Sequence, residues 1–186
     1  MRTCTLWILC VILLSGCSKP SDEVEVGMHL RSNLLQAQET SFKADITADY
    51  GDKIHIFSME CRSDVKGDLM FTVLEPESIS GITGKLTGEG GILTFDDTAL
   101  HFELLADEQL SPISAPWVLM KTLRSGYLTS ACTEDGRIRL SIDDSYESDP
   151  LRLDIWLNPE NLPAQADILY DGRRILSVVV ADFEIL

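Results

Sequence analysis

Apolar and polar residues alternate one by one along most of this chain. From Phe42 to Asp49, for example, every second residue is apolar, and each residue between them is Lys, Asp or Thr. Successive side chains of a β-strand point to opposite faces of the sheet, so this period predicts strands with one buried face. Glu134-Asp135-Gly136 and Asp171-Gly172 are typical of tight hairpin turns. The sequence therefore predicts about ten antiparallel strands.

Two interruptions of the alternation predict helices. The first is expected over about Glu23–Gln38, capped by Asp22, because apolar residues recur there at every fourth position. The second is expected within residues 111–126, where Ser114 suits the N-cap, Pro116 fits the first turn and Gly126 ends the helix. The pattern is therefore that of a large sheet accompanied by two helices.

These elements define a mainly β chain of the α+β class. A sheet of about ten strands cannot stay flat, because strand twist makes it curl, and something must fill its concave face. We therefore expect one large curved antiparallel sheet wrapped around the helices. No repeat or linker divides the chain, and residues 26–186 are expected to form this single domain.

The N-terminus is a short apolar run that ends at a cysteine. Arg2 precedes an apolar core at Leu6–Leu14, which predicts a secretory signal peptide over residues 1–16 that is too short to span a bilayer. Leu14-Ser15-Gly16-Cys17 resembles the bacterial lipobox, in which a diacylglycerol is attached to the cysteine sulfur before cleavage. Cys17 is thus the expected lipid anchor at the extracytoplasmic side of the cell membrane, with acyl chains such as palmitate, and residues 17–25 are its tether. The alternative is a plain signal peptide with an incidental cysteine.

The charge of the chain limits its partners. The formal net charge is −15, and loss of residues 1–16 would remove one arginine and no acidic residue, which leaves −16. Such a surface repels nucleic acid and anionic headgroups, so nucleic-acid binding is excluded. We therefore expect the acyl chains on Cys17, rather than electrostatic attraction, to hold the protein at the membrane.

Cys61 and Cys132 are the cysteines left beyond the anchor. An even pair in an exported chain favours a disulfide, and we expect these two residues to form one. The alternative is two free thiols in the core, because cysteine is often simply a small buried residue.

Residue patterns for catalysis or metal binding are weak. His29, His55 and His101 stand far apart, and no G-x-S-x-G motif is present. The acidic segment Asp143–Asp149 is spaced like the start of a calcium loop, but Ser148 stands where that loop needs glycine. The sequence therefore predicts no catalytic residue, no metal and no cofactor, and we do not expect an enzyme.

Four segments resemble the LolA/LolB superfamily of lipoprotein-sorting proteins. They are "KGDLMFTVLEPESISGI", "GGILTFDDTAL", "LSPISAPWVLMKTL" and "PAQADILYDGRRILSVVVADFEI". The resemblance implies an unclosed barrel whose apolar concave face, covered by helices, accommodates acyl chains. Related GerS-like bacterial lipoproteins resemble this architecture and act by binding a partner protein.

Apolar residues of the second helix are the candidate ligand contacts. Trp117, Met120 and Leu123 share one face of that helix. They are expected to face the sheet, where they either fill the core or line an apolar cavity. The expected residues on the opposing strands are Phe42, Ile46 and either Ile155 or Trp156. The leading hypothesis is a membrane-anchored LolA-like lipoprotein that binds an apolar ligand such as lipid, and the alternative is a non-enzymatic adaptor for an envelope protein.

Overall fold

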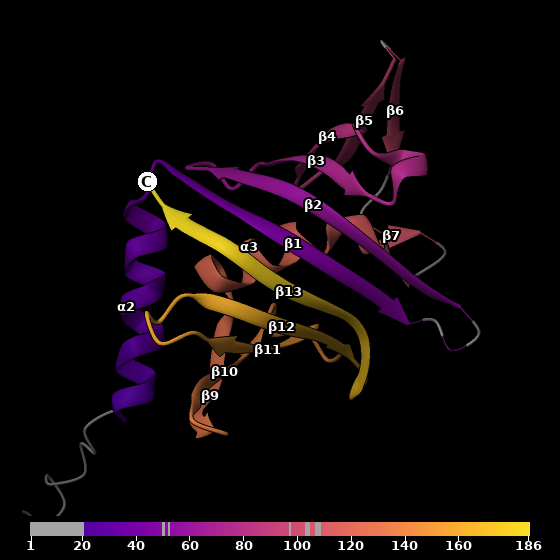
Figure 1. The fold of residues 1–186 in the computed structure, drawn as a ribbon. Helices are drawn as coiled ribbons and strands as arrows, with labels where there is room; N and C mark the ends of the chain where they lie inside the picture. The colour runs from indigo at the N-terminus through magenta and orange to yellow at the C-terminus, as the bar shows by residue number, and fades with distance from the viewer. Residues whose placement is uncertain (1–20, 50, 52, 97, 103–104, 107–108) are drawn as a thin grey trace, which may run out of the picture.

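The structure is a computed structural model of the 186-residue chain (Figure 1). It describes residues 21–49, 51, 53–96, 98–102, 105–106 and 109–186. The predicted signal peptide, the lipid anchor Cys17 and the first residues of the tether lie outside the described residues.

One antiparallel sheet of eleven strands makes up most of the molecule. Its order is β6-β5-β4-β3-β2-β1-β13-β12-β11-β10-β9, and its two end strands do not pair with each other, so the sheet is unclosed. The sheet confirms the mainly β architecture predicted from the alternation, and its unclosed form agrees with what the LolA/LolB resemblance implies. The strands are β1 (Glu39–Asp49), β2 (Ile54–Asp64), β3 (Leu69–Glu75), β4 (Thr83–Thr87), β5 (Gly90–Phe95), β6 (Thr98–Phe102), β9 (Tyr127–Glu134), β10 (Arg137–Asp143), β11 (Arg152–Leu157), β12 (Pro163–Tyr170) and β13 (Arg173–Ile185).

The predicted alternation decides which side chains enter the core. In β1, the inward residues from Phe42 to Ala48 are at most 2% exposed, whereas Lys43 and Asp45 between them are exposed. The register continues this inward row across neighbouring strands, so the apolar side chains form one surface. The members of one such row are Phe57, Ile46, Val178, Ala166, Ile155 and Leu140.

Two of the predicted hairpin turns are confirmed by their backbone angles. Asp135 and Gly136 have φ values of 49° and 77°, and Asp171 and Gly172 have values of 48° and 71°. Two consecutive positive φ values are what a type I′ turn requires, and this turn matches the right-handed twist of the strands it joins.

Helix α2 (Asp22–Gln36) begins slightly earlier than predicted. Ser21, rather than Asp22, is its N-cap, and the Ser21 hydroxyl accepts a hydrogen bond from the Val24 backbone N–H. Residues 22–25, which were expected in the tether, are therefore helical. Leu30 and Leu34 are buried where α2 packs against β9, β10 and α3.

Helix α3 (Ala115–Ser125) follows the short 3-10 helix η2 (Pro112–Ser114). It lies against the concave face of the sheet (Figure 1). Ser114, Pro116 and Gly126 occupy the predicted positions at its ends. The short 3-10 helix η1 (Glu77–Ile79) lies between β3 and β4. Strands β7 (Leu105–Ala106) and β8 (Gln109–Leu110) form a separate two-stranded ribbon.

Within the part of the chain that the structure describes, no helix is both long enough and apolar enough to cross a membrane.

Candidate functional site

Helix α3 packs against the concave face of the sheet, where it contacts β2, β10 and β13. Eight of its eleven residues are buried, and Trp117, Met120 and Leu123 are 8%, 1% and 2% exposed. They belong to one apolar cluster with Phe42 and Ile46. Five of the six residues predicted to surround an apolar cavity therefore come together, and in this structure they form a packed core.

Polar contacts fix α3 at both ends. The Trp117 indole N–H donates to the carbonyl of Gly67 at 3.1 Å, and Nη1 of Arg124 donates to the carbonyl of Asp64 at 2.7 Å. Both acceptors lie in or beside the turn between β2 and β3. From α2, Nε of Arg31 donates to the carbonyl of Leu123 at 2.8 Å. The helix is thus held by the sheet on one side and by α2 on the other.

The two arginines are the site residues that sequence reasoning missed. Burial lowers the pKa of both Arg31 and Arg124, because a charged guanidinium loses hydration there. Among the described residues, the buried Nε and Nη2 of Arg124 have no hydrogen-bond partner, and its Nη1 donates to two neutral oxygens, the Ser63 hydroxyl and the Asp64 carbonyl. Nothing in the local spacing marked either residue, because their partners lie 60 or more positions away in the chain.

Trp156 does not belong to this cluster, which corrects its prediction as a cavity residue. It lies opposite Arg139 in the register, and Arg139 precedes the inward-facing Leu140, so Trp156 faces the outer side of the sheet. Its indole N–H donates to Glu134 at 2.8 Å. Ile155, the alternative considered, is fully buried on the concave side.

The predicted disulfide between Cys61 and Cys132 is not formed, and both are free thiols. Cys61 is fully buried on the concave side of β2. Cys132 lies opposite Arg139 and therefore faces the outer side of β9, at the far end of the strand order. Two side chains on opposite faces of a sheet cannot be bridged without moving the backbone.

The histidines and the acidic segment do not form a metal centre. Among the described residues, no group of three or more His, Cys, Asp or Glu side chains is arranged to hold a metal ion. In the acidic segment, Asp144 accepts a hydrogen bond from the Leu151 backbone N–H at 2.9 Å, and Asp143 pairs with Arg152 at 3.1 Å. These carboxylates close the loop between β10 and β11.

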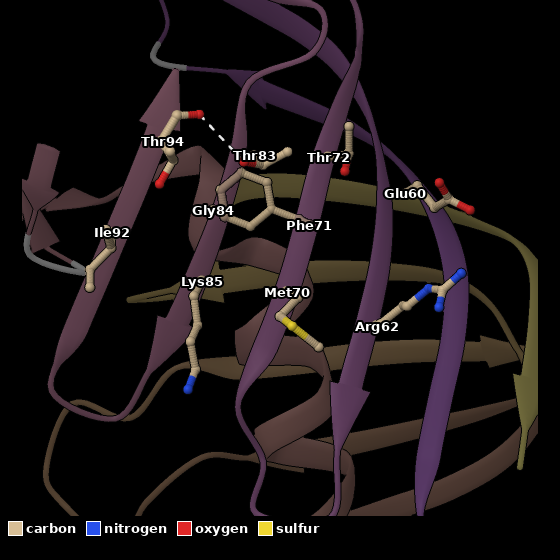
Figure 2. Close-up of a pocket in the computed structure, with 10 residues that line it drawn as sticks. All are labelled: Glu60, Arg62, Met70, Phe71, Thr72, Thr83, Gly84, Lys85, Ile92 and Thr94. Carbon is tan, nitrogen blue, oxygen red and sulfur yellow. Dashed lines mark hydrogen bonds between the residues drawn. The ribbon is translucent and has the colours of Figure 1, made fainter. Parts of the chain in front are cut away.

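A shallow groove of about 400 Å³ lies across β2 to β5 on the outer face of the sheet (Figure 2). Its walls are mixed in character: Met70 and Ile92 are apolar, Arg62 is basic, and Lys85 is paired with Asp68 at 2.7 Å. Figure 2 shows the Thr83 hydroxyl donating to the Thr94 carbonyl on the next strand. No residue of α3 lines this groove, so it is separate from the predicted cavity.

The concave face remains open at the β5–β6 end of the sheet. Phe95 and Leu100 are 58% and 62% exposed, and Leu93 and Phe102 are half-buried against the core. The register places Leu93 directly opposite Leu100, in line with the buried Phe71 through β4. These four residues, Leu93, Phe95, Leu100 and Phe102, are called the edge strip below.

Solved structures similar to this chain include LolA-like proteins. A LolA superfamily protein from Nitrosomonas europaea is 10% identical, with a TM-score of 0.46 over 90% of this chain and 94% of that one. An uncharacterized conserved protein from Thermus thermophilus is 9% identical, with a TM-score of 0.48 over 89% and 88%. The lipoprotein LppX of Mycobacterium tuberculosis is 11% identical, with a TM-score of 0.39 over 88% and 96%. No protein-family model matches the sequence, and no curated protein does either.

The structure thus defines a protein class by its architecture, an unclosed antiparallel sheet with helices against its concave face. The similarity to the solved structures lies in the fold.

Proposed function

We propose that this protein is a membrane-anchored, non-enzymatic adaptor that binds a partner protein of the cell envelope. The observation that supports this proposal is the packing of α3 against the concave face. An acyl chain needs an apolar cavity, and the space where one would lie is occupied by Trp117, Met120 and Leu123 of α3. Binding at the outer surface or at the sheet edge leaves this core intact.

The position of the anchor supports binding of a protein rather than of the bilayer. Ser21, the helix cap, follows Cys17 by four positions, so a lipid on Cys17 holds the start of α2 within about 14 Å of the membrane surface. The β5–β6 hairpin lies at the opposite end of the molecule from the start of α2 (Figure 1). The exposed apolar residues of that hairpin are therefore directed into the envelope.

Crosslinking in intact cells tests the adaptor function. A lysine-reactive crosslinker should join the anchored protein to one recurring partner, in a species heavier than the protein alone and identified by mass spectrometry. A Cys17→Ser variant, released from the membrane, should lose most of this product because the effective concentration near the partner falls. Recovery of only uncrosslinked protein, together with stoichiometric copurified lipid, would reject the adaptor.

A second candidate function is binding of an apolar ligand such as a lipid, as the sequence resemblance implies. The observation in its favour is the open edge strip, where Phe95 and Leu100 are more than half exposed. Saturable binding of a fluorescent fatty acid that is lost in Leu100→Ser would favour this candidate. Binding that survives Leu100→Ser but changes in Trp117→Ala would instead indicate a ligand under α3.

A further inference from the structure

Strand β6 is an end strand that lacks the usual protection against pairing. Among the described strands its only neighbour is β5. Edge strands in soluble proteins normally carry Lys, Pro or an inward charge, which prevents another chain from adding to the free backbone. The five residues Thr98–Phe102 contain no Pro, Lys, Arg, Asp or Glu. The other end strand, β9, packs against α2 and has a register shift against β10.

The edge strip gives this free edge an apolar side. Leu100 projects to the same side as Leu93, and Phe95 pairs in the register with Thr98, so all three flank the open backbone edge of β6. The strip continues the buried apolar row of β3 and β4, since Leu69 and Leu86 lie in register with Gly91 and Phe102. An added strand with apolar residues at alternate positions would extend the existing core by one strand.

The charge around β6 indicates what kind of segment fits. From Leu86 to Met120 the sequence contains six acidic residues and no Lys or Arg, and Asp96 is exposed at the start of the β5–β6 turn. Lys85, which lies beside His101 on the outer face, is paired with Asp68 at 2.7 Å. A second copy of this chain would bring the same acidic stretch against itself, and like charges placed opposite each other destabilise strand pairing. An anionic membrane surface is disfavoured for the same reason. A basic peptide segment is complementary.

We propose that β6 is the docking edge for an extended segment of the partner protein, which adds to the sheet as a twelfth strand. The segment has apolar residues at every second position, facing Leu93 and Leu100, and Lys or Arg residues near its ends. Main-chain hydrogen bonds to β6 supply affinity, and the alternating side chains supply selectivity. This inference rests on the proposed adaptor function and assigns the surface that performs it.

A designed peptide tests the docking edge directly. The probe is an extended peptide of alternating Val and Thr with two lysines at each end, and its matched control carries glutamates in place of the lysines. The lysine peptide should bind the protein and slow hydrogen exchange at β6 amides, and the glutamate peptide should bind at least tenfold more weakly. The preference should shrink as salt is added, because screening weakens charge complementarity.

Two lysine variants of the protein test whether the peptide binds at the edge strip. Leu100→Lys places a charge in the edge strip and should weaken binding of the lysine peptide at least tenfold. Ile56→Lys changes a residue that is 68% exposed on the outer face of β2, where it pairs with Thr47 of β1 and lies four strands from β6 in the sheet order, and it should bind as the unmodified protein does. Absence of binding at millimolar peptide, equal binding to both variants, or protection at β9 instead of β6 would overturn the inference.

The same variants separate this inference from the adaptor function itself. If Leu100→Lys abolishes the crosslinked partner in cells while Ile56→Lys retains it, the β6 edge is supported. If both variants retain the partner, the docking edge is wrong and the adaptor function stands. If the unmodified protein captures no partner, the adaptor function has failed.

Discussion

At the scale of single residues, Trp117 combines the two kinds of contact that hold α3 in place. Its ring is buried in the core, and its indole N–H bonds the Gly67 carbonyl in the β2–β3 turn. Loss of the ring removes apolar burial and leaves a cavity, whereas loss of the N–H alone leaves one carbonyl without its partner.

Trp117→Ala should therefore lower the free energy of unfolding by about 3–5 kcal/mol. Trp117→Phe should cost about 1–3 kcal/mol, since most of the burial survives while the Gly67 carbonyl loses its donor. Denaturant titration measures both values. A loss below about 1 kcal/mol in Trp117→Ala would mean that α3 lies over a pre-existing cavity, as binding of a lipid under this helix requires.

The two cysteines should differ sharply in reactivity. Burial raises the pKa of the Cys61 thiol, and the nearby Glu60 carboxylate adds to the effect, so little reactive thiolate forms there. Iodoacetamide should label Cys132 in the native protein and reach Cys61 only after unfolding. Mass mapping without reductant checks this, and a linked Cys61–Cys132 peptide would contradict the free-thiol structure.

At the scale of elements, β4 depends on a glycine that lies beneath an aromatic ring. A Cβ atom added to Gly84 would lie 2.4 Å from Cζ of Phe71 and 2.7 Å from the carbonyl oxygen of Ile92. The ring can move, but the Ile92 oxygen belongs to the backbone of β5, so the strand pair itself would have to shift.

Gly84→Ala should for this reason destabilise the protein by about 1–3 kcal/mol. Gly88→Ala is the matched control, because an added Cβ there meets nothing within 4 Å. Thermal or denaturant unfolding of the two variants measures the difference. Equal stability of the two would show that β4 and β5 are not held at the spacing described.

The alternation of apolar residues predicted the strands well, because burial on one face imposes a period of two. It left undecided whether Ile155 or Trp156 faces inward, since both are large and apolar and adjacent residues point to opposite faces. The register settles the choice in favour of Ile155. The same rule explains Cys61 and Cys132: each strand was recognised, but the face that each thiol occupies depends on pairing with distant strands.

At the scale of the whole molecule, the sequence predicted a curved sheet around helices, and the structure has this arrangement. Whether the helices line a cavity or fill it could not be predicted, because an apolar helix face serves either purpose. The contacts of Arg31 and Arg124 were also inaccessible, since each joins segments that are distant in the chain.

Membrane attachment is predicted to depend on one atom, the sulfur of Cys17. Cys17→Ser should move the protein from the membrane fraction to the soluble fraction, because the acidic surface offers no attraction to anionic headgroups. Fractionation followed by a high-salt wash measures the distribution. Retention of Cys17→Ser on washed membranes would show that another part of the chain binds the bilayer.

The adaptor proposal depends above all on the packing of α3 against the concave face, where Trp117, Met120 and Leu123 occupy the position that an acyl chain would take. Native mass spectrometry of the Cys17→Ser protein, incubated with excess palmitate, examines that face without interference from the lipid anchor. We expect only the mass of the polypeptide without bound palmitate. This should hold equally for the Cys17→Ser protein and for the same protein carrying Leu100→Lys. A stoichiometric palmitate adduct that persists in Leu100→Lys and is altered in Trp117→Ala would contradict the filled core.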